Sequence, residues 1–246
     1  MTVDPLFVDL FSGDGRGPDD IRKLARAGAP WHGLMVKATE GLYYHGDPWL
    51  AKVWPVAHGV DDPRIDERLG VDWWVTAYHY FIAHQDPVAQ AHSFLAEIAK
   101  VGGWTRGTIY PCVDVEEGNQ IGGMTGTRVV DGVSKWVEVV KAETGRDVVL
   151  YGGHWLRELG IRDRMGCVGL WLAAYTAHLQ PHLYTSAGWD LETLFAWQYN
   201  GDGESYLAGY PHTTPLGPED ISALTIAGGG DAALEHLRVQ CWPTKL

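Results

Sequence analysis

The chain has 246 residues with a formal net charge of -12, and its 46% hydrophobic and 20% charged residues are typical of a globular protein with a sizeable core. The acidic balance argues against nucleic acid as a partner, because phosphate groups favour a basic surface. No apolar run approaches the roughly 18 residues of a membrane span, and the first residues, MTVDPLFVDLF, lack the basic start of a signal peptide.

Strand-like segments rich in β-branched and aromatic residues recur along the chain. They are expected at residues 6–11, 33–38, 73–81, 108–115, 147–151, 167–175, 194–199 and 219–226. Helical patterns lie between the first five of them, at residues 18–28, 47–59, 86–102 and 125–145, and a closing helix is expected at 227–239. The alternation of strands with helices predicts a parallel sheet.

The spacing of these strands changes along the chain. The first units are roughly 30–40 residues apart, whereas the last strands are about 20–25 residues apart, which is too short for a full crossover helix. The sequence therefore predicts an α/β fold, a modified TIM-like barrel of about five β/α units followed by three further strands joined by loops. No linker, repeat or low-complexity segment interrupts the chain, so residues 1–246 are expected to form a single catalytic barrel domain.

An acidic cluster follows the fourth strand, in the stretch YPCVDVEEG at residues 110–118. Asp114 and Glu116 are two residues apart, so both side chains leave the same face of the strand, at the end of a barrel strand where active sites lie. Two like charges this close raise the pKa of one carboxyl group, which is what a general acid requires. The alternative is a structural ion pair with Lys37 or Arg106.

Further acidic and aromatic side chains are expected at the other strand ends. The acids are Asp9, Glu40 and Asp220, each of which is alternatively a helix cap or turn residue. The aromatic residues are Tyr78, Tyr80, Tyr151, Trp171, Tyr175 and Trp197, and the alternative for each is that it fills the core. Acids together with flat aromatic rings indicate a carbohydrate cleft, and pairs of carboxyl groups are the usual equipment for hydrolysing a glycosidic bond.

The order of these motifs resembles a known family. The segments FVDLFS, MVKATEG, VTAYHYF, YPCVDVEEG, VVLYGGHW, LWLAAYT, FAWQYNGDG and EDISAL are similar, in sequence order, to the strand motifs of glycoside hydrolase family 25 lysozymes, the Chalaropsis-type muramidases common among phage endolysins. The resemblance covers nearly the whole chain. It implies a modified barrel that needs no metal or cofactor and that cleaves the β-1,4 bond between N-acetylmuramic acid and N-acetylglucosamine in bacterial peptidoglycan.

The resemblance also implies roles for individual residues. Glu116 matches the proton donor, and Asp114 matches the acid that positions the 2-acetamido group of the substrate. Asp9 and Asp220 match two further acids at the ends of the first and last strands. The sequence departs from the family pattern at Ser222, where an Asn is usual. Such an enzyme is expected to be made in the cytoplasm of a phage-infected bacterium and to act on the cell wall after release.

Two other hypotheses stay open at this point. One is a non-catalytic barrel that binds cell-wall carbohydrate, and the other is a metal-dependent barrel hydrolase that uses the acids and His79 as ligands. His79 is expected on the opposite strand face from Tyr78, where it packs against helices. His178 and His182 have zinc-like spacing, but Pro181 between them disfavours a helix. No feature of the sequence specifies an oligomeric state.

Two remaining features are interpreted as structural. The segment at 56–72 lengthens the second crossover and is either a substrate-facing insertion or a solvated surface helix, of which the surface helix is favoured. Cys112 and Cys167 lie in apolar strand-like runs and are expected in the core rather than in a disulfide framework.

Overall fold

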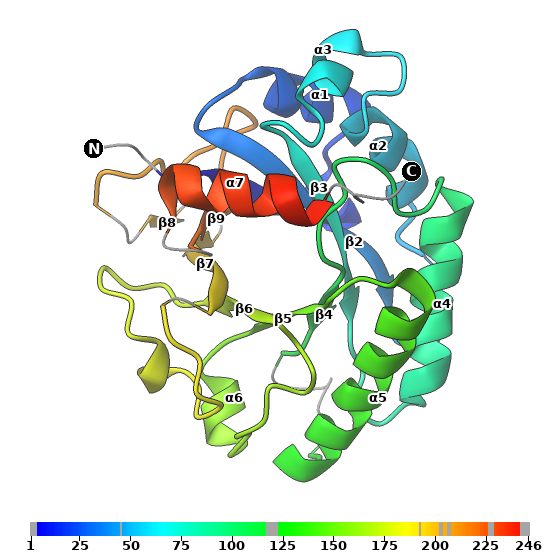
Figure 1. Cartoon of the computed structure of the whole chain (residues 1–246), viewed down its shortest axis with the longest axis vertical. Coiled ribbons are helices and arrows are strands. Elements are labelled where there is room, and N and C mark those ends of the chain that lie inside the picture. The colour runs from blue at the N-terminus through cyan, green and yellow to red at the C-terminus, as the bar shows by residue number, and fades with distance from the viewer. Residues whose placement is uncertain are drawn as a thin grey trace.

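The structure is a computed structural model that describes residues 4–44, 46–116, 123–191, 193–201, 204–205, 208–225 and 229–241. Eight strands of this part of the chain close into a barrel, in the order β6-β5-β4-β3-β2-β1-β9-β7, because β6 also pairs with β7 (Figure 1). These strands are β1 (Leu6–Leu10), β2 (Trp31–Glu40), β3 (Trp74–Tyr80), β4 (Cys112–Asp114), β5 (Val149–Gly152), β6 (Gly169–Ala173), β7 (Leu194–Gly201) and β9 (Asp220–Leu224). The predicted modified TIM-like barrel is confirmed.

The helices follow the predicted change of spacing. After β1 to β5 come α1 (Pro18–Arg26), α2 (Leu50–Ala57) with α3 (Pro63–Arg68), α4 (Pro87–Lys100), α5 (Gly126–Thr144) and the short α6 (Trp155–Glu158). Proline opens α1, α3 and α4, where a missing N–H costs nothing. The later strands are joined by loops, the short 3-10 helices η1 (Ser12–Asp14) and η3 (Pro181–Leu183) lie in connections, and β8 (Glu204–Ser205) forms a hairpin with β7. The chain then enters α7 (Gly230–Cys241).

Strand direction determines which residues meet at the mouth of the barrel. Strands β1 to β7 all run parallel to one another, whereas β9 lies between β1 and β7 and is antiparallel to both. The last residues of the parallel strands therefore lie at the same end as the first residue of β9. The register pairs Asp9 with Asp220 across β1 and β9, which brings these two acids from opposite ends of the sequence to one edge.

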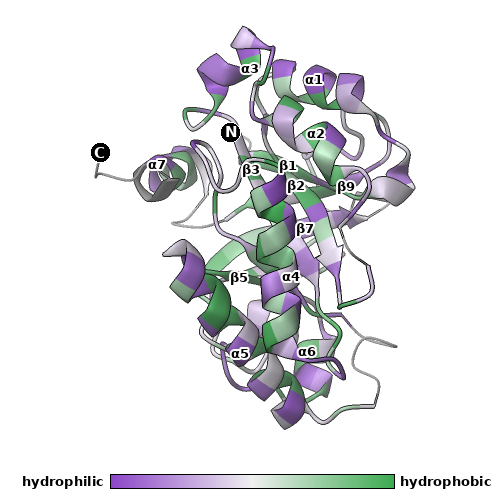
Figure 2. Cartoon of the chain, turned by 90° about the vertical axis from the view of Figure 1, so that its right-hand side faces the viewer, coloured by the Kyte–Doolittle hydropathy of each residue, from purple (hydrophilic) through white to green (hydrophobic). Residues whose placement is uncertain are grey.

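Alternation along the strands separates two apolar clusters. Val8, Leu34 and Val113 point outward and pack with the helices, whereas Phe7 and Cys112 point into the barrel. The apolar strands and the polar outer faces of the helices are evident in Figure 2. Cys112 and Cys167 are both buried and unpaired, as expected.

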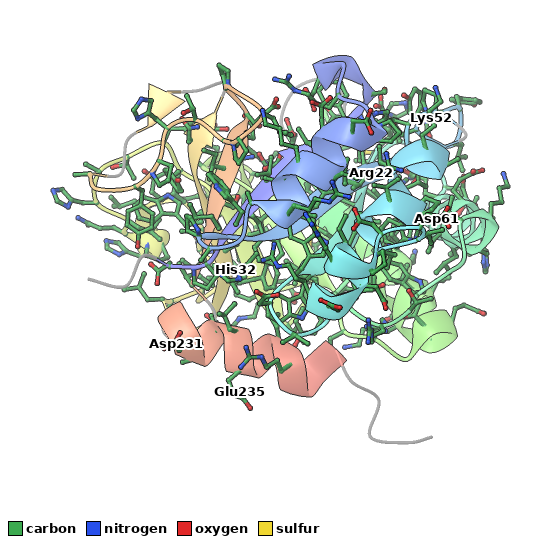
Figure 3. All side chains as sticks on the ribbon, turned by 90° about the horizontal axis from the view of Figure 1, so that it is seen from above. Arg22, His32, Lys52, Asp61, Asp231 and Glu235 are labelled. Carbon is green, nitrogen blue, oxygen red and sulfur yellow. The ribbon has the colours of Figure 1, made fainter. Side chains whose placement is uncertain are left out.

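Helix α7 covers the end of the barrel opposite the carboxyl ends of the parallel strands. Ala233 and Leu237 are fully buried in the interior cluster with Phe7 and Trp74. Asp231 and Glu235 lie on the other face of the helix and point to solvent (Figure 3). The barrel interior is thus closed at one end, and a cleft can open only at the other.

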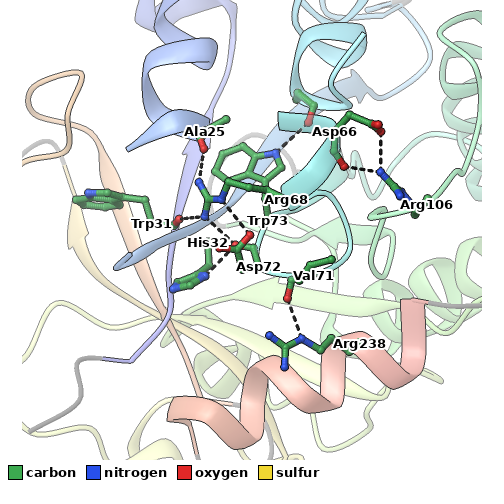
Figure 4. A network of polar contacts seen from close by, with 11 residues as sticks. Ala25, Trp31, His32, Asp66, Arg68, Val71, Asp72, Trp73, Arg106 and Arg238 are labelled. Carbon is green, nitrogen blue, oxygen red and sulfur yellow. Dashed lines mark hydrogen bonds and ion pairs between the residues drawn. The ribbon is translucent and has the colours of Figure 1, made fainter. Parts of the chain in front are cut away.

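The long second crossover at residues 56–72 lies at the closed end. Arg68 donates hydrogen bonds to the carbonyls of Ala25 and Trp31, and pairs with Asp72 at 3.0 Å (Figure 4). Arg238 of α7 donates to the carbonyl of Val71 at 2.8 Å. These contacts place the segment at the amino ends of β2 and β3, so the surface interpretation holds and the substrate-facing one is wrong. In the described part of the chain, no helix is long and apolar enough to cross a membrane.

Candidate active site

A cleft of about 260 Å³ opens at the carboxyl ends of the parallel strands. Six acidic side chains and one basic side chain line it, together with five aromatic rings. The lining residues are Asp9, Phe11, Asp14, Lys37, Tyr78, Tyr80, Asp114, Glu116, Tyr151, Trp171, Glu219 and Asp220. The cleft therefore brings together most of the acids and tyrosines predicted at separate strand ends, namely Asp9, Asp114, Glu116, Asp220, Tyr78, Tyr80 and Tyr151.

Asp114 and Glu116 face the cleft together, as their spacing predicted. Asp114 is the last residue of β4 and is only 4% exposed, whereas Glu116 lies two residues beyond it and is half-buried. Val113, which precedes Asp114, and Val115, which lies between the two acids, point outward into the helix-facing core. One carboxyl group is thus held deep in the wall of the cleft and the other stands nearer its opening.

The environment of Asp114 raises the pKa of its carboxyl group. Burial, and then the charge of Glu116, raise the pKa of Asp114 well above its ordinary value, while the ammonium group of Lys37 lowers it. Its Oδ1 atom is buried and accepts no hydrogen bond from any residue the structure describes. A buried oxygen without a donor is costly, so this atom is available for a donor that a bound substrate supplies.

The second pair of acids is held by an amide. Gln198 Nε2 lies 3.1 and 3.3 Å from the two carboxylate oxygens of Asp9 and 3.3 Å from Oδ2 of Asp220. Burial and the charge of Asp220 raise the pKa of Asp9 well above its ordinary value, and the Gln198 hydrogen bond lowers it. Gln198 belongs to the quoted motif FAWQYN, yet sequence reasoning assigned it no role. The sequence signal for such a role is that Gln198 is a polar residue within the apolar run of β7.

Lys37 is the one basic residue among those lining the cleft. Its Nζ pairs with Glu40 at 2.6 Å and lies 4.4 Å from the ring centroid of Tyr80, and the rings of Phe11 and Tyr44 lie within 6 Å. The sequence leaves Lys37 and Arg106 open as direct partners of the acid pair. Arg106 instead pairs with Asp66 at 2.6 Å near the closed end of the barrel, so that alternative is wrong for Arg106.

Aromatic side chains contribute much of the lining of the cleft. Tyr78, Tyr80, Tyr151 and Trp171 all line it, and Trp171 is fixed by a hydrogen bond from its Nε1 to Ser222 Oγ at 2.8 Å. Ser222, the departure from the family pattern, therefore supports a cleft residue. Burial raises the pKa of Tyr78, Tyr80 and Tyr151, so these hydroxyl groups stay protonated and can donate.

Three of the predicted binding residues do not line the cleft. Trp197 points outward into the core cluster around the barrel and donates its Nε1 to the carbonyl of Ala174, because its neighbour Gln198 occupies the inward face. Its prediction as a substrate-binding residue is wrong. Tyr175 is 47% exposed and reaches the site through a 2.9 Å hydrogen bond to Gln198. Glu40 lines a neighbouring groove, and it is linked to the cleft by its ion pair with Lys37, which lines the cleft.

The metal-site alternatives find no support in the geometry. His79 is fully buried on the outer face of β3, where it stacks on Trp136 and contacts Gln90 and Thr39, so it cannot join the acids of the cleft. Across the described ranges, no three His, Cys, Asp or Glu side chains are grouped as metal ligands, and His178 and His182 are exposed.

Residues 16–206 match the model described as glycosyl hydrolases family 25. The chain belongs to this family. It is therefore a glycoside hydrolase, as predicted, although no curated protein gives a significant match. The matched range contains Asp114 and Glu116, while Asp9 and Asp220 lie outside it and reach the same cleft through the fold.

Solved structures of family 25 enzymes have the same fold. A lysozyme from Aspergillus fumigatus is 20% identical, with a TM-score of 0.71 and coverage of 99% of this chain and 100% of the other. A glycosyl hydrolase from Bacillus anthracis is 21% identical, with a TM-score of 0.69 and coverage of 98% and 94%. The catalytic domain of endolysin ply40, from a bacteriophage of Listeria monocytogenes, is 17% identical, with a TM-score of 0.64 and coverage of 97% and 98%.

Proposed function

We propose that this member of glycosyl hydrolases family 25 is a peptidoglycan N-acetylmuramidase, which cleaves the β-1,4 bond between N-acetylmuramic acid and N-acetylglucosamine. The observation that carries the proposal is the pair of carboxyl groups at the end of β4, with Asp114 buried and Glu116 nearer the opening. Family membership and the lysozyme, muramidase and endolysin folds support the same substrate class.

In this mechanism Glu116 is the general acid. It gives its proton to the bridging oxygen as the bond from that oxygen to the anomeric carbon breaks. Asp114 accepts a hydrogen bond from the N–H of the 2-acetamido group on Oδ1, the atom without a donor among the described residues. This contact orients the acetamido carbonyl oxygen toward the anomeric carbon, where it forms the new bond of an oxazolinium-like intermediate.

The second half of the reaction needs a base and a water molecule. Glu116, now ionised, takes a proton from water as the water oxygen attacks the anomeric carbon, the ring of the intermediate opens, and the acid is restored. The remaining carboxyl groups, Asp9 and Asp220, line the same cleft and stabilise the positive charge that develops on the sugar. Tyr151 and Trp171 provide apolar faces against which the sugar ring packs.

The bacterial cell wall is the proposed target. The chain would be made in the cytoplasm of a bacterium, including a phage-infected one, and would reach peptidoglycan after release. The support is the fold shared with the endolysin catalytic domain.

The test is the chemistry of the new chain ends. Purified cell walls are incubated with the protein, with and without a chelator, and turbidity is followed. The digest is then reduced with borohydride and hydrolysed. Muramitol is the expected product, because a muramidase leaves N-acetylmuramic acid at the reducing end. Glucosaminitol would contradict the assigned bond, loss of activity with chelator would favour the metal-dependent hydrolase, and binding without cleavage would favour the non-catalytic barrel.

A further inference from the structure

A second groove lies beside the catalytic cleft, past the carboxyl ends of β2 and β3. It has a volume of about 550 Å³, and its lining includes Glu40, Tyr43, Tyr44, Tyr80, His84 and Gln85. Tyr80 belongs to both hollows, since it also lines the cleft. The groove and the cleft therefore adjoin at the ring of Tyr80.

The turn that carries Tyr43 is held from several sides. The N–H of Gly41 donates to the carbonyl of Tyr80 at 3.0 Å, and the N–H of Leu42 donates to Gln85 Oε1 at 2.6 Å. The hydroxyl group of Tyr44 lies within hydrogen-bond distance of Asp47. Gly41 has a φ of +49°, and a Cβ there would lie 2.5 Å from Gln85 Oε1. The backbone of this turn is thus fixed before any ligand arrives.

The side chain of Tyr43 is the most exposed of the large apolar and aromatic residues in the described chain. It is 84% exposed, whereas the ring of Tyr80 beside it is half-buried. A single exposed ring needs no explanation by itself. A ring that stands on a fixed turn, at the side of a groove leading to a glycosidase cleft, offers a flat face with little entropy to lose on binding.

The charge of the groove favours a neutral ligand. Its acid, Glu40, is paired with Lys37 at 2.6 Å, so the carboxylate is already compensated. The other groups in the groove are tyrosine rings, the imidazole of His84 and the amide of Gln85. Gln85 Oε1 is occupied by Leu42, and its Nε2 donates to no other residue that the structure describes. Rings with nearby amide and imidazole groups suit a sugar that carries hydroxyl and acetamido groups.

We propose that this groove binds a further N-acetylated hexosamine of the same glycan strand, beyond the sugars held in the catalytic cleft. Tyr43 and Tyr80 supply the faces on which this sugar packs, and His84 and Gln85 supply polar contacts. The inference rests on the proposed glycan-hydrolase function, and it makes Tyr43 a residue that determines the preference for long strands.

The experiment uses reduced oligosaccharides of alternating N-acetylglucosamine and N-acetylmuramic acid, from disaccharide to octasaccharide. We expect kcat/KM of the unchanged protein to rise at the step where the strand reaches Tyr43. Tyr43→Ala should reduce that step by about three- to tenfold, because the ring contact is lost, while Tyr43→Phe should retain it. Leu183→Ala is the matched control, because Leu183 is 50% exposed but lies in η3, outside both hollows, and its length dependence should be unchanged.

The same length series separates this inference from the proposed function. If Tyr43→Ala lowers kcat/KM equally on short and long substrates, or on neither, the proposed role of the groove is wrong. Binding of the uncleaved oligosaccharides to Glu116→Gln, with and without Tyr43→Ala, is measured by calorimetry. If the unchanged protein cleaves no glycan but still binds octasaccharide more tightly through Tyr43, the muramidase proposal fails and the groove stands. If Tyr43→Ala does not weaken octasaccharide binding, the groove is refuted.

Discussion

Gln198 donates its amide nitrogen to both carboxylate oxygens of Asp9, at 3.1 and 3.3 Å, and also to Asp220 at 3.3 Å. Its carbonyl oxygen accepts from the hydroxyl groups of Tyr151 and Tyr175, both at 2.9 Å. One side chain on β7 thus joins acids from β1 and β9 to tyrosines from β5 and the segment after β6. A buried amide with both ends occupied fixes the geometry of the site and moderates the repulsion between two neighbouring acids.

Replacing this amide should damage both the site and the fold. Gln198→Leu leaves Asp9 without its donor, so we expect the free energy of unfolding to fall by about 1–3 kcal/mol and wall lysis to fall at least about tenfold. Gln198→Glu should be worse at neutral pH, because it places a further carboxyl group against two others, and should recover partly in acid. Urea unfolding and lysis rates at two pH values check this. Full activity and stability in Gln198→Leu would mean that the amide has no such role.

The carboxyl pair at the end of β4 should be essential for turnover. Glu116→Gln keeps the shape of the side chain but cannot deliver a proton, so lysis should fall by about 10²–10⁴-fold. Asp114→Asn should also reduce turnover strongly, because the amide stabilises the cationic intermediate less well. Circular dichroism should show an unchanged fold for both variants. Retention of more than about a tenth of activity in Glu116→Gln would refute its role as the acid.

Lys37 should set the acid limit of activity. The pKa of Asp114 is raised by burial and by Glu116 and is lowered by Lys37. Removing the ammonium group in Lys37→Met raises that pKa further, so the carboxylate that the mechanism needs is lost at a higher pH. The acid limb of the pH profile of kcat/KM should therefore move to higher pH, while Lys37→Arg should leave the limb nearly in place. If the acid limb does not move in Lys37→Met, the charge of Lys37 does not affect the pKa of Asp114.

At neutral pH, the ionised carboxylate of Asp9 should destabilise the folded protein. Burial and Asp220 raise its pKa well above the ordinary value of 3.8, so above that pH the folded state holds a proton more tightly than the unfolded chain does. Stability therefore falls as the pH rises through the raised pKa. Asp9→Asn should raise Tm at pH 7 while lowering activity. Asp19→Asn is the control at an acid with a 97% exposed side chain, and its Tm should not change. A lower Tm for Asp9→Asn would contradict this account.

Sequence patterning was enough to place some of these residues and not others. The spacing of Asp114 and Glu116 fixes their common face, because strand side chains alternate. The meeting of Asp9 with Asp220 depends on the antiparallel entry of β9, which is a property of strand pairing that no local pattern contains. The neighbours Trp197 and Gln198 must face opposite ways, and Gln198 takes the inward face because a polar side chain in an apolar strand needs a partner.

His58 should make the protein sensitive to acid. His58 follows α2 directly, and its burial lowers its pKa from 6.5 to about 4; its ring contacts the carbonyl of Trp54 at 2.8 Å and Thr108 Oγ1 at 3.0 Å. As the pH falls, His58 becomes protonated near pH 6.5 in the unfolded chain but only near pH 4 in the folded state. The stability present above pH 6.5 is therefore lost as the pH falls through this window, by about 2 kcal/mol at pH 5.

The matched variant is His58→Gln, which keeps polar contacts but does not titrate. Its free energy of unfolding, measured by urea denaturation between pH 7 and pH 4.5, should depend less steeply on pH than that of the unchanged protein. Some dependence should persist because the pKa of buried His79 is also lowered, to about 3. His178→Gln, at an exposed position, serves as the control and should not alter the slope. Equal slopes for His58→Gln and the unchanged protein would show that His58 is already protonated, or equally accessible, in the folded state.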